Sequence, residues 1–199
     1  MNPTPPDHPA LDTHRSDARV RDLADRDFVA RRRVITFTRT VAAPREAVFP
    51  QLCPTREHDW IDGWNAELVY SESGYGEDRC VFRTGEDNAT GPGLWTFSHV
   101  DAPGLLKIVR VMPPFLQHLR VDLIDNGDGS CDTRWTVTVT ALDARGNALL
   151  EALPDDDESF AGSADALVHY FATGSMRARE DGGADHGLLA AAARHRREG

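Results

Sequence analysis

The stretch from Cys53 to Thr84 does most to restrict the fold of this 199-residue chain. It begins with a short polar helical segment that ends at Trp60 and turns at Gly63. Two predicted strands follow, Ala66–Ser71 and Cys80–Thr84, with a Gly-rich turn between them. A strand and a helix precede this stretch, and further strands and one helix follow it. This order of elements is compatible with few folds.

The first predicted strand is Val34–Val41, which is rich in β-branched residues and alternates apolar with polar side chains. The dipeptide Ala43-Pro44 then begins a helix, because proline suits the first helical turn, where its missing N–H would have no partner. Pro50 cannot continue that helix, so we expect the helix to be short or broken.

Four more predicted strands follow Thr84 with the spacing of an antiparallel meander. Their apolar residues alternate with polar ones, and Asn126–Gly129 is a strong hairpin signal before the last of them. The four strands are Gly93–Val100, Leu105–Met112, Gln117–Ile124 and Thr133–Leu142.

The last predicted element is a helix that begins in the acidic run Asp155–Glu158, where carboxylates complement the helix dipole. Its apolar residues recur at spacings of four, three and four and form one continuous stripe, and Gly174 is a plausible end. The residues of this stripe are Phe160, Ala164, Leu167 and Phe171.

Three segments carry a resemblance to a known family: TRTVAAPREAVFPQL at Thr38–Leu52, the segment Trp60–Trp64, and the closing helix. Together they resemble the helix-grip fold of the START and birch-pollen-allergen-like (SRPBCC) superfamily, which includes polyketide cyclases. The resemblance implies an α+β fold in which a seven-stranded antiparallel sheet curls around a long C-terminal helix, with two short helices after the first strand. It also implies a large apolar cavity for lipids, polyketides or other hydrophobic molecules.

The resemblance spans residues 34–176, which we therefore expect to form the folded domain. Residues 1–33 are rich in proline and mixed charge, so we predict a disordered N-terminal arm. Residues 177–199 are polar and have little apolar surface, so we predict a flexible C-terminal tail.

Composition argues against several classes of partner. The formal net charge of −10 is unfavourable for nucleic acid or an anionic membrane as the main partner. No apolar run is long enough to span a bilayer, and no secretory signal is recognised. Three cysteines form an odd set that favours reduced, buried thiols, so we expect a cytoplasmic protein. The use of arginine for every cation except Lys107 suggests a GC-rich bacterial genome.

Motifs for metal, phosphate and nucleophile chemistry are missing from the sequence. It contains no phosphate-binding loop, no HExxH or CxxC pair and no Gly-x-Ser-x-Gly elbow. His58, Asp59 and Asp62 lie close together, and we assign them to an exposed helix start rather than to a metal site. We therefore expect no metal, no cofactor and no recognisable catalytic set.

The predicted ligand site combines aromatic residues with three candidate polar residues. His99 shares an alternation face with Trp95 and Phe97, whereas the faces of Arg83 and Arg110 stay open. A buried arginine would need an anionic partner, because an unpaired buried charge is costly. The candidate ligand-binding residues are Trp64, Tyr70, Arg83, Trp95, Phe97, His99, Arg110, Trp135, Leu167 and Phe171.

Three functions are compatible with this site. The preferred prediction is non-enzymatic binding of a hydrophobic small molecule. The alternatives are a cyclase or dehydratase, with His99 and either Arg83 or Arg110 polarising a carbonyl, and an interaction module whose interior is filled by its own side chains. A cavity of roughly 300–1,000 Å³ is expected for a binder or enzyme and not for a filled interior.

Overall fold

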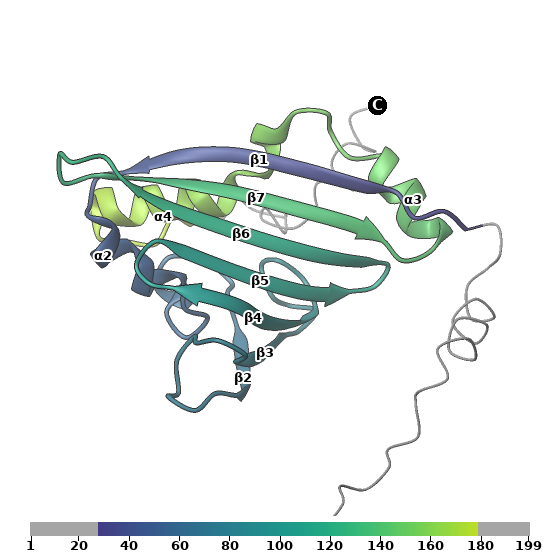
Figure 1. Cartoon of the computed structure of the whole chain (residues 1–199), viewed down its shortest axis with the longest axis horizontal. Helices are drawn as coiled ribbons and strands as arrows, with labels where there is room; N and C mark the ends of the chain where they lie inside the picture. The colour runs from purple at the N-terminus through teal and green to yellow at the C-terminus, as the bar shows by residue number, and fades with distance from the viewer. Residues whose placement is uncertain (1–27, 179–199) are drawn as a thin grey trace, which may run out of the picture.

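The computed structural model describes residues 28–178, and within them seven strands form one antiparallel sheet (Figure 1). The strand order is β1-β7-β6-β5-β4-β3-β2, so that β1 and β2 form the two edges. The strands are β1 (Arg32–Val41), β2 (Ala66–Tyr70), β3 (Val81–Thr84), β4 (Gly93–Asp101), β5 (Leu105–Met112), β6 (Phe115–Asp125) and β7 (Cys131–Ala141).

The helices of the described region are short and lie in two groups. The first group follows β1, where Pro50 stands in the first turn of a 3-10 segment and the α-helix ends just before it, as the sequence predicts. It consists of α2 (Arg45–Val48), η1 (Phe49–Leu52) and η2 (Glu57–Asp59). The second group follows β7 and consists of α3 (Ala144–Glu151), η3 (Asp157–Phe160) and α4 (Gly162–Thr173).

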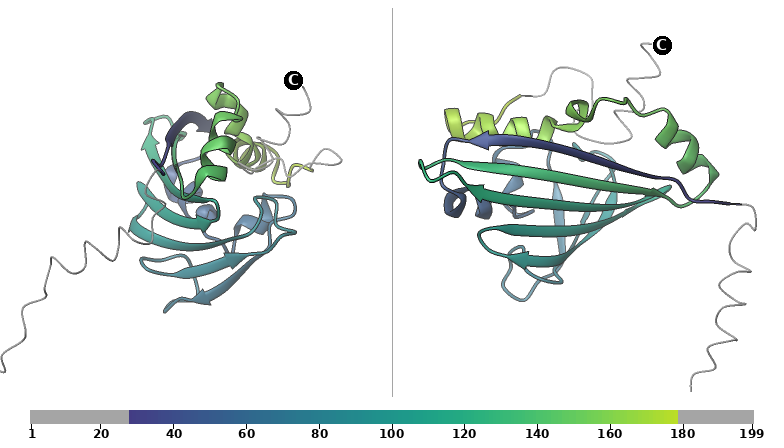
Figure 2. Two further views of the ribbon diagram at one scale, coloured as in Figure 1. Left: turned by 90° about the vertical axis from the view of Figure 1, so that its right-hand side faces the viewer. Right: turned by 45° about the horizontal axis from the view of Figure 1, so that its top comes forward.

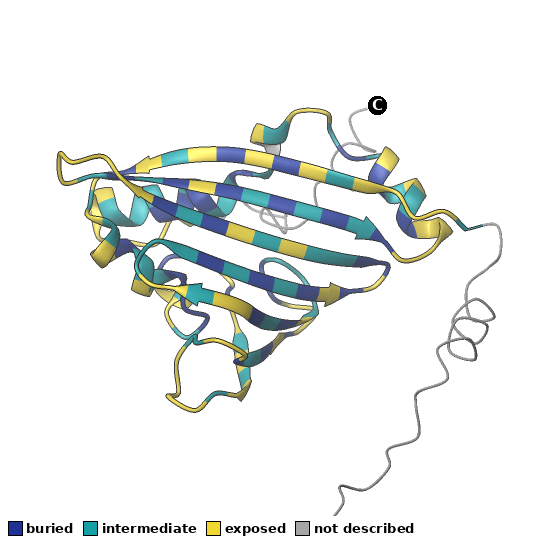
Figure 3. Cartoon of the chain, in the orientation of Figure 1, coloured by how far each residue is buried: buried dark blue, intermediate teal, exposed yellow. Residues whose placement is uncertain are grey.

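The sheet is strongly curved, and α4 lies against β1 at the end of the strand order (Figure 2). Buried and less buried residues alternate along the strands (Figure 3). In β7 every second residue from Cys131 to Ala141 is buried, which is the period-2 pattern of a strand with one face on the core. The predicted seven-stranded α+β architecture is therefore confirmed.

The closing helix is shorter than the long helix that we expected. The acidic run lies in η3 and its approach, where Asp156 accepts a hydrogen bond from the Glu158 N–H, and α4 begins only at Gly162. The predicted end is correct, because Gly174 caps α4 with a positive φ of 69° and donates its N–H to the Tyr170 carbonyl.

Helix α3 contains the pair Gly146-Asn147, which is typical of turns. Asp143 caps it by accepting a hydrogen bond from the Gly146 N–H at 2.7 Å. Gly146 serves packing rather than a turn, since a Cβ there would lie 2.7 Å from the Pro114 carbonyl oxygen. The Gly-Asn pair is therefore compatible with helix at this position.

Strand structure and contacts with α3 are present before residue 34, the predicted start of the domain. Strand β1 starts at Arg32, and the Asn147 side chain of α3 bonds the Val29 carbonyl and the Arg31 N–H at 2.9 and 2.8 Å. At the other end, Arg177 forms a bridge with Ile61. The rest of the predicted arm and tail lies outside the described residues. Among the helices described, none has the length and apolarity to cross a membrane.

Candidate ligand-binding site

A cavity of about 90 Å³ lies between the inner face of the sheet and the segment that joins η3 to α4. Five strands contribute to its wall, together with the β3–β4 loop. The lining residues are Ile35, Phe37, Thr90, Trp95, Arg110, Gln117, Leu119, Trp135, Val137, Phe160 and Ser163.

Strand alternation places two polar side chains in this apolar wall. Arg110 belongs to the buried face of β5, which also carries Ile108 and Met112. Gln117 is its direct partner on β6 and occupies the same face as Leu119. The two polar residues are therefore neighbours on the inner surface of the sheet.

Arg110 is only 3% exposed, and its contacts are with neutral groups. One terminal nitrogen, Nη2, donates to the carbonyls of Thr90, Gly91 and Pro92 at 2.8, 2.8 and 3.0 Å. The guanidinium carbon lies 4.2 Å from the ring centre of Trp95, which is a cation–π contact. These contacts tie the β3–β4 loop to the cavity wall.

The charge of Arg110 has no carboxylate partner among the described residues. Its Nε and the Gln117 Oε1 are buried without a hydrogen-bond partner there. Burial lowers the pKa of Arg110 to about 9, so the side chain stays largely protonated at neutral pH. A buried cation with unused donors next to an unused acceptor favours a polar guest in the cavity.

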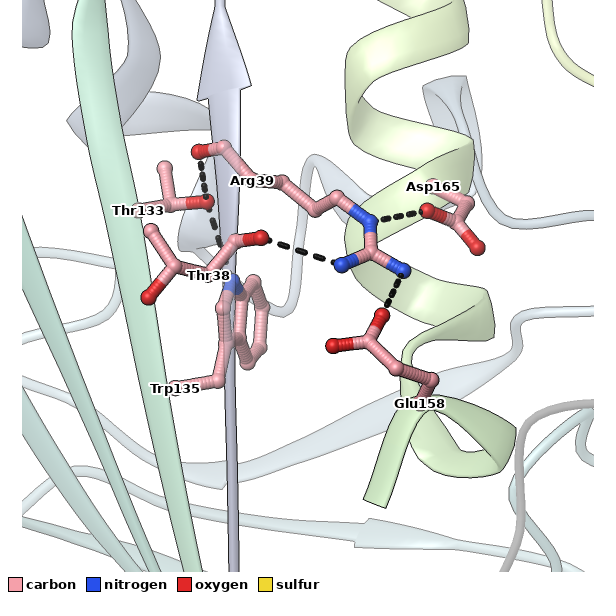
Figure 4. Close-up of polar contacts among 6 residues, drawn as sticks. All are labelled: Thr38, Arg39, Thr133, Trp135, Glu158 and Asp165. Carbon is pink, nitrogen blue, oxygen red and sulfur yellow. Dashed lines mark hydrogen bonds and ion pairs between the residues drawn. The ribbon is translucent and has the colours of Figure 1, made fainter. Parts of the chain in front are cut away.

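Ion pairs hold the covering segment to β1 (Figure 4). Arg39 donates from Nε to Asp165 of α4 at 2.5 Å, and its Nη2 lies 2.7 Å from a carboxylate oxygen of Glu158. Beside this pair, the Trp135 Nε1 donates to the Thr133 hydroxyl at 3.1 Å, and that hydroxyl donates to the Arg39 carbonyl. Trp135 in the cavity wall is thus linked through Thr133 to Arg39, whose ion pairs hold α4 against β1.

Three of the ten predicted ligand residues line this cavity: Trp95, Arg110 and Trp135. Phe97 faces a different hollow, between η1 and β4. The structure therefore brings together part of the predicted set and separates one aromatic residue from it.

Three other predicted residues point away from the cavity, and we correct their placement. Tyr70 is 60% exposed on the edge strand β2. Arg83 is exposed and makes two hydrogen bonds of 2.8 Å to Glu67, because Phe82 and Thr84 take the inward positions of β3.

His99 is exposed, although strand alternation groups it with Trp95 and Phe97. A register shift between Phe97 and His99 marks a β-bulge in the pairing of β4 with β5. The extra residue of a bulge reverses the alternation beyond it, so Val100 rather than His99 turns inward.

The remaining three predicted residues belong to the packed core. Trp64 donates from Nε1 to the Pro54 carbonyl at 2.8 Å and meets Trp95 edge to face. Leu167 is fully buried, and Phe171 is partly buried against Tyr170. Trp64, Phe82, Trp95 and Phe97 form one aromatic cluster through ring contacts.

Several lining residues were absent from the predicted set. Gln117 shares its alternation face with Leu119 and Val121. The sequence signal for its inward position was therefore present. Ser163 and Thr90 lie in segments without strand periodicity, and no comparable signal marks them.

The cavity is also smaller than expected. Its 90 Å³ is below the size of a drug-sized pocket, roughly 300–1,000 Å³, and below the roughly 150 Å³ of an apolar cavity that accepts benzene. Among the described residues no cluster of three or more histidines, cysteines or acids is placed to hold a metal ion.

Solved structures with similar backbones are numerous, although sequence identity is low. Norcoclaurine synthase from Thalictrum flavum superposes with a TM-score of 0.56 and 15% identity, covering 73% of this chain and 98% of that one. The protein Mll3558 from Rhizobium loti has a TM-score of 0.51 and 16% identity, covering 71% and 99%. Ara h 8.0201 has a TM-score of 0.51 and 12% identity, covering 72% and 99%.

No family model matches the sequence, and no curated protein is similar to it at the sequence level. The shared backbone nevertheless shows the fold: the chain has the helix-grip fold of these structures. This confirms the fold that the sequence resemblance implied.

Proposed function

We propose that the protein binds a compact hydrophobic molecule that carries a carboxylate or carbonyl oxygen, in the cavity beneath η3 and α4. The apolar part contacts the indoles of Trp95 and Trp135. The oxygen accepts a hydrogen bond from the guanidinium of Arg110.

The observation that carries this proposal is the buried guanidinium without an anionic partner. Carbonyl dipoles and the Trp95 ring offset part of the cost of burying a charge. No described residue accepts a hydrogen bond from Nη1 of Arg110. A ligand oxygen supplies such an acceptor, and a charge-assisted hydrogen bond of this kind is stronger than a neutral one.

Cavity size supports a small ligand rather than a lipid or a polyketide. A volume of about 90 Å³ suits a short branched chain, and a single ring enters only if the lining side chains move apart. The same fold accommodates single-ring molecules in norcoclaurine synthase from Thalictrum flavum, which was solved in complex with dopamine and hydroxybenzaldehyde.

Binding is favoured over catalysis by the chemistry of the lining. The cyclase alternative required His99 with an arginine, and His99 is exposed outside the cavity. Arg110 is the one ionisable side chain among the described residues that line the cavity. A guanidinium can orient a carbonyl, but proton transfer needs a group whose pKa lies near the working pH.

The test is a calorimetric titration of the full chain with benzoate and with its neutral analogue benzyl alcohol. We expect benzoate to bind more tightly, and we expect it to shift the emission of Trp95 and Trp135. Ser163→Phe fills the cavity from α4 and should abolish both signals. Thr38→Phe, on the exposed face of β1, is the matched control and should bind as the wild type does.

Two results would contradict the proposal. Equal affinity for the charged and the neutral compound would show that Arg110 does not select the ligand. Unchanged benzoate binding by Ser163→Phe would place the site elsewhere. Chromatography of the recovered benzoate and of hydroxybenzaldehyde after incubation would reveal any turnover, which would favour the enzyme alternative.

A further inference from the structure

A second hollow of about 280 Å³ lies on the other side of the aromatic cluster, between η1, the β2–β3 loop and the end of β4. Its floor is apolar and consists of Leu52, Phe97, Val100 and Leu106. This volume is three times that of the cavity beneath α4 and approaches the lower limit of small-molecule pockets, roughly 300 Å³.

The β-bulge in β4 explains why space remains here. Beyond Phe97 the next inward residue of β4 is Val100, three positions along instead of two. The bulge bends the strand and turns Ser98 and His99 outward. No side chain of β4 therefore occupies the position between Phe97 and Val100 on the inner face.

One wall of the hollow is a well-connected loop. Glu77 accepts hydrogen bonds from the Ser71 hydroxyl at 2.8 Å and from the backbone N–H groups of Glu72 and Ser73. Hydrogen bonds from the side chains of Ser73 and Ser71, together with these backbone bonds, lower the pKa of Glu77 to about 2. From this loop, the Gly76 N–H donates a hydrogen bond to the Sγ of Cys53 at the end of η1, at 3.0 Å. The hollow is thus bounded by contacts that link the loop to η1.

The rim of the hollow carries one cation. Arg56 lines the hollow, and its guanidinium makes no ion pair or hydrogen bond with any residue in the part of the chain that the structure describes. Tyr75 also lines the hollow and is 57% exposed. The cation of Arg56, without an acidic partner among the described residues and beside an apolar hollow, favours an anionic ligand at this rim.

We propose that this second hollow is a separate binding site for an amphipathic monoanion. Its apolar ring or chain lies on Phe97, Val100 and Leu106, and its charged group lies at the rim beside Arg56. Apolar burial supplies most of the affinity, and the charge of Arg56 selects anions over neutral molecules of the same shape.

A matched pair of fluorescent probes tests this inference. 1-Anilinonaphthalene-8-sulfonate is an anion, and N-phenyl-1-naphthylamine has the same ring system without the sulfonate. We expect the full chain to enhance the emission of both. Arg56→Gln should weaken binding of the anion about fivefold, the effect of one partly exposed charge pair, and should change that of the amine less than twofold. Arg134→Gln, on an exposed face of β7, should change neither.

Variants that place a larger side chain in one hollow or the other show which of the two binds the probe. Val100→Trp should remove the binding of both probes, whereas Ser163→Phe in the other cavity should leave both intact. Tyr75→Ala, which removes an exposed side chain and spares the core, should weaken both. Near-ultraviolet circular dichroism checks that each variant is folded, since the anion also binds loosely packed states.

Three outcomes would overturn the inference: equal loss of both probes in Arg56→Gln, full binding by Val100→Trp, or loss of binding in Ser163→Phe. The last would assign the probes to the cavity beneath α4. Benzoate is itself a small aromatic monoanion, so variants assign its site: loss in Ser163→Phe with retention in Val100→Trp and Arg56→Gln reports on the cavity beneath α4. Failure of one site is then distinguishable from failure of the other.

Discussion

Arg110 connects a loop, a cavity and an aromatic ring through a single side chain. Its guanidinium holds three consecutive carbonyls of the β3–β4 loop, and its flat face lies on Trp95. Asn88 supports the same loop by donating to the Asn65 carbonyl at 2.7 Å. Buried side chains rather than water donate to these backbone carbonyls, so the conformation of the β3–β4 loop depends on Arg110 and Asn88.

Replacing Arg110 by methionine should reduce the free energy of unfolding by about 2 kcal/mol. The loss of charge-assisted hydrogen bonds outweighs the relief of removing a buried charge, because three carbonyls lose their donor. Urea denaturation measures the effect, with Arg134→Met as an exposed control that we expect to lie within about 0.5 kcal/mol of the wild type. A more stable Arg110→Met would show that desolvation dominates.

Glu57 should make stability dependent on pH. Burial raises its pKa from 4.5 to about 8. The folded state then binds more protons than the unfolded chain between these values, so the free energy of unfolding should fall as the pH rises through this window. The slope is at most about 1.4 kcal/mol per pH unit for one group.

The comparison variant for this effect is Glu57→Gln, which cannot ionise. Its unfolding free energy, measured by urea titration from pH 5 to pH 8, should fall less steeply than that of the wild type. Glu67→Gln, an exposed residue paired with Arg83, should retain the wild-type slope. Parallel curves for Glu57→Gln and the wild type would refute the assignment.

Among the structural elements, the strands and the end of the closing helix could be predicted, whereas helix α3 and the start of α4 could not. Period-2 alternation encodes a strand directly, which is why β5 has the predicted bounds Leu105–Met112. Helix α3 depends on the contact of Gly146 with the Pro114 carbonyl, which is a tertiary contact. The late start of α4 at Gly162 likewise follows from the 3-10 segment before it.

The candidate site was predictable only where alternation continues without interruption. Trp95, Arg110 and Trp135 lie on regular strand segments and face inward. The bulge that exposes His99 has no signature in the sequence around it, because one additional residue leaves the composition of a strand unchanged. The size of the cavity depends on how all the surrounding side chains pack.

Leu167 is the residue through which α4 should contribute most to stability. It is fully buried, so Leu167→Ala should lower the free energy of unfolding by about 2–5 kcal/mol. Phe171 is only partly buried, and we expect a smaller loss for Phe171→Ala. Thermal melting of both variants, with Thr173→Ser as a conservative control, tests the order. A larger loss at Phe171 would show that α4 packs by a different face.

Gly76 should tolerate no larger side chain. A Cβ there would lie 2.5 Å from Cε2 of Phe97 and 3.2 Å from Cδ of Pro54. Gly76→Ala should therefore cost about 1–3 kcal/mol and displace the loop from Phe97. In the matched control Gly85→Ala, the nearest atom is the mobile end of the Asp87 side chain, so its cost should be small. Calorimetric melting of the two variants gives the comparison, and equal stability would contradict it.

On the scale of the whole molecule, the first edge of the sheet is closed by the segment that covers the cavity. Asp157 of η3 accepts a hydrogen bond from the Thr36 N–H of β1 at 3.0 Å and pairs with Arg33. An edge strand with free N–H groups can pair with another chain, and a carboxylate at that position blocks such pairing.

Truncation should show where the stable domain begins. A protein of residues 28–178 should melt within a few degrees of the full chain, because the proline-rich and charged ends bury little by composition. A protein of residues 34–176 lacks Arg32 and the contacts of Val29 and Arg31 with Asn147, so it should melt at a lower temperature. Differential scanning calorimetry compares the three, and equal melting of the two truncated proteins would show that these contacts add nothing.

The one-residue bulge in β4 affects which amino-acid substitutions can change ligand recognition. The hollow beside it and the cavity beneath α4 share the aromatic cluster, but their rims come from different segments of the chain. Substitutions in η1 or the β2–β3 loop can therefore alter one recognition surface while the other keeps its chemistry. A scaffold divided in this way offers two independent starting points for selection or for engineering.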